Sequence, residues 1–169
     1  DENSALLNRA TQGLYPPGST FKVITALSYL KNGGKLTDTF DCKGSYTEDG
    51  YTIHCYGGEV HGEQTFKQAF GNSCNVAFSK VGLSLPKGAL KSTAQEFMFN
   101  KSIRSEISNI KKSQFTLKSS DSKALVMQTS IGQGNTLVTP LQMALISEAV
   151  ANNGIVRDPF VVDHIENNE

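Results

Sequence analysis

The sequence predicts a mainly helical α+β fold in a single domain. Apolar residues recur at helical spacing after Ser19 and again after Thr139, whereas the stretch between Cys42 and Cys55 has the pattern of a β-hairpin around an Asp-Gly turn. A chain of 169 residues is long enough for one domain with a hydrophobic core. Its 16 basic and 16 acidic residues cancel, so the charge gives no reason to expect nucleic acid as a partner.

The first predicted helix covers residues 19–32. The proline-glycine turn before Ser19 is costly inside a helix, and a glycine pair follows the last apolar residue, so both ends are defined. Residues three apart lie on one helix face, which brings the Lys22 amine within reach of the Ser19 hydroxyl. The helix dipole disfavours a protonated Lys22 and favours a negative oxygen on Ser19. The pair therefore has the pattern of a serine nucleophile activated by an amine.

A Ser-x-x-Lys pattern alone is a weak signal, because it occurs five times: at Ser19/Lys22, Ser28/Lys31, Ser84/Lys87, Ser108/Lys111 and Ser120/Lys123. The alternative is that Ser19 only caps a helix and Lys22 is a solvated side chain. Ser28 and Lys31 fit that alternative well, since they lie further along the same helix without a turn in front of them.

A second signal is the stretch Gly71-Asn72-Ser73-Cys74-Asn75, which follows an expected short helix at 65–70. A serine and an asparagine two residues apart on a tight turn point the same way. They can supply a hydroxyl for proton relay and an amide to hold a substrate backbone. The alternative is an ordinary turn in which the asparagines make local hydrogen bonds.

Together these segments resemble the transpeptidase domain of class B, or monofunctional, penicillin-binding proteins. Residues 8–22 are similar to the nucleophile segment of that family, and Ser73-Cys74-Asn75 matches its second motif. A glycine loop at 131–134, the helix that begins near Thr139 and the turn at 151–154 resemble a third stretch. The likeness extends from about residue 8 to about residue 162.

The resemblance implies a partial β-lactamase/transpeptidase-like fold, with the helical subdomain present and most strands of the central sheet missing. The expected parts are the nucleophile helix 19–32, a hairpin insert 36–62, a helical subdomain 65–153 and a terminal strand 156–165. Helices are expected at about 65–70, 74–82, 86–99, 121–130 and 139–152, with a Ser-, Lys- and Asn-rich surface loop at 100–120. An unpartnered terminal strand would expose an edge, so we expect dimerisation through it.

The resemblance also implies an acyl-transfer mechanism that needs no cofactor. Ser19 would attack the penultimate D-alanine carbonyl of a peptidoglycan stem peptide, with Lys22 as the general base. Ser73 would pass the proton towards the leaving D-alanine, and Asn75 would hold the substrate amide. β-Lactams would acylate Ser19. Further substrate-binding candidates are Gln133 and Gly134 of the glycine loop.

One departure from the family is the lack of any Lys-Thr-Gly or Lys-Ser-Gly tripeptide, which in the family lies some tens of residues after the Thr-Pro-Leu-Gln helix. We therefore expect a truncated domain that is inactive in isolation, from a parent anchored at its N-terminus on the outer face of the bacterial membrane. A serine β-lactamase or β-lactam sensor, and a non-catalytic cell-wall binding module, remain alternatives.

The cysteines leave several states open. Cys42 and Cys55 flank the predicted hairpin, so a disulfide between them is our preferred prediction for an extracytoplasmic protein. Free thiols are an alternative, and the nearby His54 and His61 would suit zinc, although we assign no metal site. Cys74 is expected to be a small buried residue.

Overall fold

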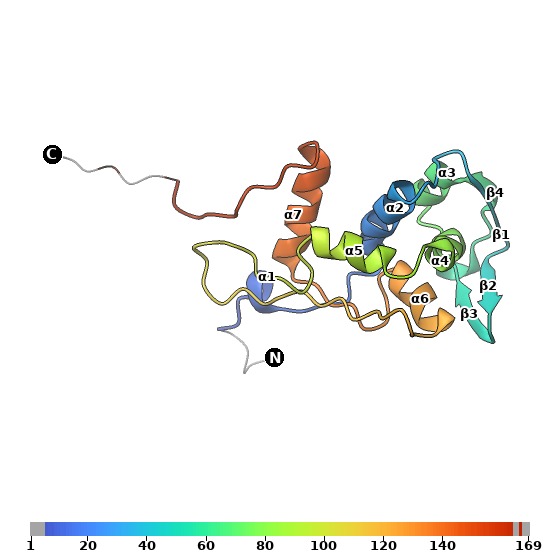
Figure 1. Ribbon diagram of the computed structural model, residues 1–169, viewed down its shortest axis with the longest axis horizontal. Coiled ribbons are helices and arrows are strands. Elements are labelled where there is room, and N and C mark those ends of the chain that lie inside the picture. Colours follow the sequence, from blue (N-terminus) through green and yellow to red (C-terminus); the bar gives the residue numbers. More distant parts are fainter. Residues whose placement is uncertain (1–5, 164–165, 167–169) are drawn as a thin grey trace.

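The structure is a computed structural model that describes residues 6–163 and 166. A helical body occupies most of the molecule, and the four strands of its described residues gather at one end, beside α3 and α4 (Figure 1). None of the helices among these residues is both long and apolar enough to cross a membrane. The helices are α1 Arg9–Gln12, α2 Lys22–Lys31, α3 Phe66–Gly71, α4 Asn75–Ser84, α5 Ala89–Glu96, α6 Lys123–Ser130 and α7 Pro140–Ala151, with 3₁₀ turns η2 Gly18–Phe21 and η3 Tyr56–Gly58.

The predicted nucleophile helix begins as a 3₁₀ turn. Ser19 lies within η2, and the α-helical hydrogen bonds start only at Lys22, whose own N–H bonds back to the Ser19 carbonyl. Gly18 has a φ of 57°, in the left-handed region, so the position suits glycine and the chain turns sharply into the helix there. The helical path therefore follows the predicted range closely, but its first turn is tighter than an α-helix.

The hairpin is confirmed and a second strand pair joins it. β2 (Ser45–Glu48) and β3 (Tyr51–His54) are antiparallel, and the turn residues Asp49 and Gly50 both have positive φ, as a two-residue type I′ turn requires. β1 (Thr39–Cys42) pairs with β4 (Gly62–Thr65), which the sequence analysis did not predict. The strands on either side of the hairpin are only four residues long, so their alternation pattern is weak.

The remaining helices lie close to their predicted positions, with α5 the clearest difference. It spans Ala89–Glu96 where 86–99 was expected. Pro86 removes a backbone donor before the helix, and Gly88 has a φ of 85°, so the chain enters the helix only after Gly88. α3 begins as expected because Thr65 and Gln68 form a capping box.

α2 is the central helix, with an apolar cluster on each side. One cluster joins Phe21 and Ile24 to α5, α7 and the loop around Phe115, and the other joins Ala26 to α3, α4 and α6. Phe21 is fully buried, with its ring centroid 5.8 Å from that of Phe99 and 6.0 Å from that of Phe115. Because α2 is enclosed on both sides, even Lys22 in its first turn is only 2% exposed.

The glycine loop at 131–134 packs directly on the turn before α2. The Gly18 N–H donates to the Gly132 carbonyl oxygen at 2.9 Å, and an antiparallel bridge joins Tyr15 to Val138. A Cβ atom on Gly132 would lie 1.9 Å from the Gly18 carbonyl oxygen. Only glycine at this position allows the two backbones to approach so closely.

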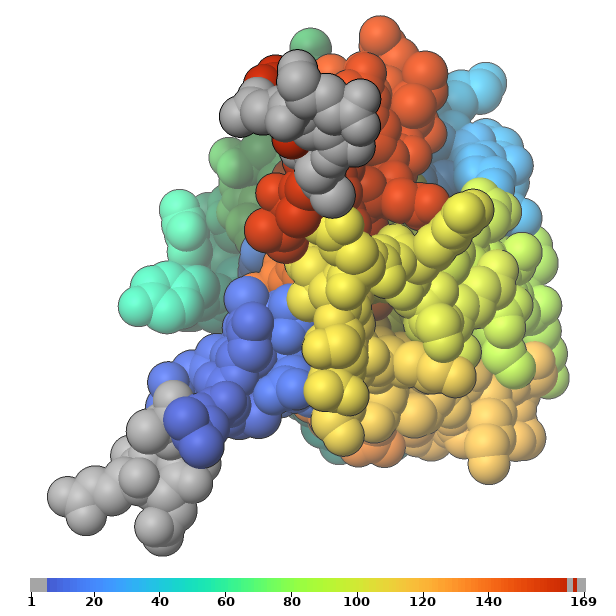
Figure 2. Space-filling model, turned by 90° about the vertical axis from the view of Figure 1, so that its left-hand side faces the viewer, coloured from blue at the N-terminus to red at the C-terminus, as the bar shows by residue number. Residues whose placement is uncertain are grey.

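The predicted terminal strand at 156–165 is wrong for the residues that the structure describes. Residues 156–163 form no strand, and positions 164 and 165 lie outside the described residues. The segment instead lies along the 100–120 loop (red against yellow in Figure 2), where the Ser105 hydroxyl donates to the Pro159 carbonyl oxygen and the Glu106 carboxylate accepts the N–H groups of Val161 and Val162. Side chains thus satisfy its backbone in place of a neighbouring strand. Residues 156–163 therefore offer no strand edge, and the predicted dimerisation stays a prediction.

Gly132→Ala should lower the free energy of unfolding by about 2–5 kcal/mol, because it adds left-handed strain to a backbone clash. Gly88→Ala carries a similar positive φ but meets open space, so it should cost only about 1 kcal/mol. Gly71→Ala, at the end of α3 with no atom within 4 Å, should be neutral or stabilising. Chemical denaturation measures all three, and equal costs for the Gly132 and Gly88 variants would contradict the proposed close approach.

Candidate active site

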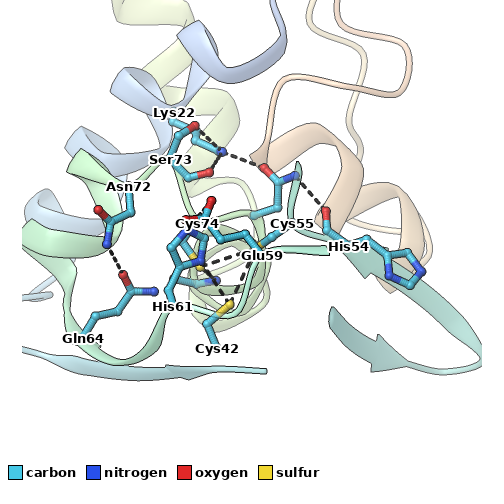
Figure 3. Close-up of polar contacts among 12 residues, drawn as sticks. Lys22, Cys42, His54, Cys55, Glu59, His61, Gln64, Asn72, Ser73 and Cys74 are labelled. Atoms are coloured by element: carbon cyan, nitrogen blue, oxygen red, sulfur yellow. Dashed lines mark hydrogen bonds and ion pairs between the residues drawn. The ribbon is translucent and has the colours of Figure 1, made fainter. Parts of the chain in front are cut away.

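The Lys22 amine lies at the meeting point of α2 and the turn before α4. Its Nζ atom is 3.3 Å from Ser19 Oγ, 3.0 Å from Ser73 Oγ, 2.6 Å from the Ser73 carbonyl oxygen and 2.7 Å from Asn75 Oδ1 (Figure 3 shows Lys22 and Ser73). The structure therefore brings together all four residues that the two sequence motifs single out. Ser19 and Ser73 are exposed while Lys22 is buried between them.

The four oxygens around Lys22 differ in what they can do. The Ser73 carbonyl and the Asn75 amide oxygen can only accept, whereas the two hydroxyls can donate or accept. A neutral amine has two N–H groups and one lone pair. Its N–H groups can satisfy the two obligate acceptors, which leaves the lone pair to accept a proton from a serine hydroxyl. The geometry is therefore compatible with an amine acting as a base.

Burial favours this neutral form. Desolvation lowers the pKa of Lys22 from 10.5 to about 8, and the nearby Cys74 and Cys55 sulfurs oppose the shift only in part. The Phe78 ring, whose centroid lies 5.5 Å from Nζ, forms part of the apolar wall. With a pKa of about 8, about a tenth of the amines are neutral at pH 7, against fewer than about one in a thousand for an ordinary lysine.

The turn that carries Ser73 is strained and firmly held. Ser73 has a φ of 51°, which costs a residue with a side chain about 1–2 kcal/mol. The Cys74 sulfur caps α4 by accepting the N–H of Ala77, and Asn75 Nδ2 donates to the His54 carbonyl oxygen at 2.9 Å. These contacts fix the turn from both sides, so the strained conformation persists.

The glycine loop lies near this group through its backbone. Gly132 contacts Gly18, the residue before Ser19, while Gln133 and Gly134 follow in an exposed part of the loop. Their predicted roles in substrate binding remain predictions. The sequence analysis assigned no role to Gly132. The signal for one is the Gly-x-Gly pattern that Gly132 forms with Gly134, because paired glycines are typical of a backbone that approaches another segment closely.

The whole sequence, residues 1–169, matches the penicillin binding protein transpeptidase domain family. The chain belongs to that family. It is 36% identical over 171 residues to a peptidoglycan D,D-transpeptidase PbpA of Mycolicibacterium smegmatis and 34% identical over 168 residues to PbpA of Mycobacterium tuberculosis. These alignments cover 98% and 96% of this chain but 34% of each relative, so the chain spans about a third of their length.

Solved structures give the same result for the fold of this transpeptidase domain. A structure of penicillin-binding protein A from M. tuberculosis, an imipenem acyl-enzyme complex, superposes with a TM-score of 0.85 at 34% identity. The match covers 93% of this chain and 37% of that one. The predicted α+β transpeptidase-like fold and the resemblance to class B penicillin-binding proteins are confirmed.

Beneath the active-site turn, the transpeptidase domain buries all three of its cysteines together. Cys42 ends β1, Cys55 follows β3, and Cys74 lies between Ser73 and Asn75. The Sγ atoms of Cys42 and Cys55 are 3.6 Å apart, and those of Cys55 and Cys74 are 3.8 Å apart. All three are free thiols here, so the predicted Cys42–Cys55 disulfide is not formed, and the prediction that Cys74 is buried agrees with its exposure of 0%.

The thiols have different electrostatic environments. Burial alone would raise the pKa of Cys42, but hydrogen bonds from His61 and from the backbone of Gly44 outweigh it and lower that pKa well below the usual range. Burial raises the pKa of Cys74. The surroundings therefore favour a negative charge on the Cys42 sulfur and disfavour one on the Cys74 sulfur.

Ser73→Gly should be more stable than Ser73→Ala by roughly 0.5–1 kcal/mol. Both variants lose the hydroxyl, but only glycine is relieved of the left-handed strain, and the greater freedom of its unfolded chain offsets part of the gain. The midpoints of urea denaturation compare the two. If the alanine variant were the more stable, the strain assigned to this turn would be wrong.

Proposed function

We propose that the protein is a peptidoglycan D,D-transpeptidase that works through an acyl-serine intermediate. The observation that carries the proposal is the position of the Lys22 amine, which lies within 3.3 Å of the Ser19 hydroxyl and 3.0 Å of the Ser73 hydroxyl. One buried amine can therefore take a proton from an exposed nucleophile and exchange it with a second exposed hydroxyl. This arrangement performs the proton transfers of acyl transfer without a histidine.

In the proposed reaction, the Ser19 oxygen attacks the carbonyl carbon of the penultimate D-alanine while its proton moves to Lys22 Nζ. The Ser19 N–H, in the first turn of the helical segment, would stabilise the negative carbonyl oxygen that results. Ser73 passes a proton from Lys22 to the nitrogen of the leaving D-alanine. An amine of a second stem peptide then attacks the ester and regenerates Ser19.

The relatives support this assignment of substrate and partners. The two PbpA proteins are named as peptidoglycan D,D-transpeptidases, and M. tuberculosis penicillin-binding protein A forms acyl-enzyme complexes with imipenem and penicillin G. We infer that this protein likewise acts on stem peptides and is acylated by β-lactams. Its site of action is then the outer face of the bacterial membrane, and an N-terminal anchor would hold the parent protein there.

Acylation by penicillin should occur at Ser19. When the whole protein, as the cell produces it, is incubated with penicillin G, its intact mass should rise by the mass of the antibiotic, because the opened lactam stays attached as an ester. Ser19→Ala should show no adduct. Ser28→Ala is the matched control, since Ser28 belongs to the other Ser-x-x-Lys pair of the same helix and is buried. An adduct that survives in the Ser19 variant would refute the proposed nucleophile.

The acylation rate should rise with pH and level off above about 8, because the neutral Lys22 amine is the active form and its pKa is lowered to about 8. Asn75→Asp places a carboxylate where the amide oxygen lies 2.7 Å from Nζ, so it should raise that pKa and move the midpoint upwards. Stopped-flow measurements with a chromogenic cephalosporin give the profile.

Asn72→Asp is the control for added charge. Its side chain points away from Lys22, with Asn72 Nδ2 donating to Gln64 Oε1 at 3.0 Å (Figure 3). The same negative charge at that position should move the midpoint much less. Equal shifts in the two variants would mean that the profile does not report the proton on Lys22.

A further inference from the structure

Four potential metal ligands converge beneath the active-site turn. They are the sulfurs of three cysteines and one nitrogen of a histidine, and all four ligand atoms lie within 4.8 Å of one another: Cys42, Cys55, His61 and Cys74. The cysteines are at most 4% exposed, and the His61 side chain is 7% exposed. Figure 3 shows the histidine ring and the three sulfurs facing the same point, from separate segments of the chain.

The spacing of these atoms matches a tetrahedron around zinc. With Zn–S bonds of about 2.3 Å and a Zn–N bond of about 2.05 Å, tetrahedral angles place two sulfurs about 3.8 Å apart and a sulfur and a nitrogen about 3.5 Å apart. The observed distances are 3.6 Å for Cys42 to Cys55, 3.8 Å for Cys55 to Cys74, and 3.4 Å for Cys42 Sγ to His61 Nδ1. Three neighbouring edges of the ligand set therefore have the expected lengths.

The outer surroundings of His61 fit the same role. While Nδ1 faces the sulfurs, Nε2 lies 3.5 Å from the carboxylate of Glu59. A carboxylate on the far nitrogen fixes the ring orientation and leaves Nδ1 free to bind a metal, which is the usual arrangement around a zinc-bound histidine. His54, the other histidine that the sequence suggested, is exposed and is not part of this group.

We propose that this cluster is a structural zinc site with four protein ligands, Cys42, Cys55, His61 and Cys74. Zinc would bind three thiolates and a neutral imidazole, and the thiols would release their protons to solvent as they bind. Because the protein supplies all four ligands, no position remains open for water, which makes the site structural and not catalytic. A zinc site at this position is incompatible with the predicted Cys42–Cys55 disulfide and corrects the prediction of no metal site.

The site would join four separate segments of the chain. The end of β1, the end of the hairpin, the loop before β4 and the active-site turn each contribute one ligand. Cys74 follows Ser73 and precedes Asn75, so the metal would fix the backbone between the two groups that contact Lys22. A disulfide between Cys42 and Cys55 would compete with zinc, and Cys74 and His61 would then have no metal to bind.

The test is the metal content of the whole protein, produced in zinc-supplemented medium and purified without chelator or reductant. Elemental analysis by inductively coupled plasma mass spectrometry should find one zinc ion per chain. After exchange, Co²⁺ should give the intense visible bands of tetrahedral cobalt together with thiolate-to-cobalt charge transfer. Glu59→Gln should weaken zinc binding about 10–100-fold, as loss of an outer carboxylate does.

The two histidines provide the matched pair. His61→Ala should lose zinc, whereas His54→Ala, which removes an exposed ring and keeps the backbone carbonyl that Asn75 contacts, should retain it. This pair keeps the test decisive even if a cysteine variant fails to fold. Two results would overturn the proposal. One is a protein without zinc, whether its intact mass corresponds to free thiols or is lower by the two hydrogens lost in a disulfide. The other is an equal zinc content in the His61 variant and the wild type. Neither readout involves acylation, so the result is independent of the proposed function.

Discussion

The contact on which the site depends is the one between the buried Lys22 amine and the turn before α4. Two oxygens that can only accept, the Ser73 carbonyl and the Asn75 amide, lie 2.6 and 2.7 Å from Nζ, and these contacts join α2 to α4. Removing an amine from water requires such partners, because an unsatisfied buried amine is costly. The same contacts hold the two serine hydroxyls beside it, so the groups that make burial possible also build the reactive arrangement.

Two supports on opposite sides keep this contact in place. On one side, the glycine loop packs against the nucleophile turn through the close approach of Gly132 to Gly18. On the other side, the cysteine cluster lies beneath Ser73 and Asn75 and reaches them through Cys74. The first support is a backbone contact that needs glycine, and the second is a group of side chains from four segments. Together they resist the release of strain in the Ser73 turn.

Much of the fold and the catalytic group could be predicted from local sequence. The proline-glycine turn before Ser19, the Asp-Gly hairpin and the short helix at 65–70 are each decided by neighbouring residues, and these predictions were correct. The β1–β4 pair and the cysteine cluster depend on contacts between distant segments, so periodicity could not reveal them. The terminal strand was wrong because an apolar run becomes a strand only when a partner strand is available, and residues 156–163 have side-chain partners instead.

Two Ser-x-x-Lys pairs lie along η2 and α2, and their surroundings distinguish the proposed reactive pair from a coincidence. Both have the same spacing on one continuous helical segment. Lys31, nine residues after Lys22, is half-exposed and forms an ion pair with Glu96, while the Ser28 hydroxyl is buried and has no hydrogen-bond partner among the described residues. Lys22 instead meets neutral oxygens in a buried setting that lowers its pKa. The spacing only makes contact possible, and the proposed reactivity depends on groups some 50 residues further along the chain.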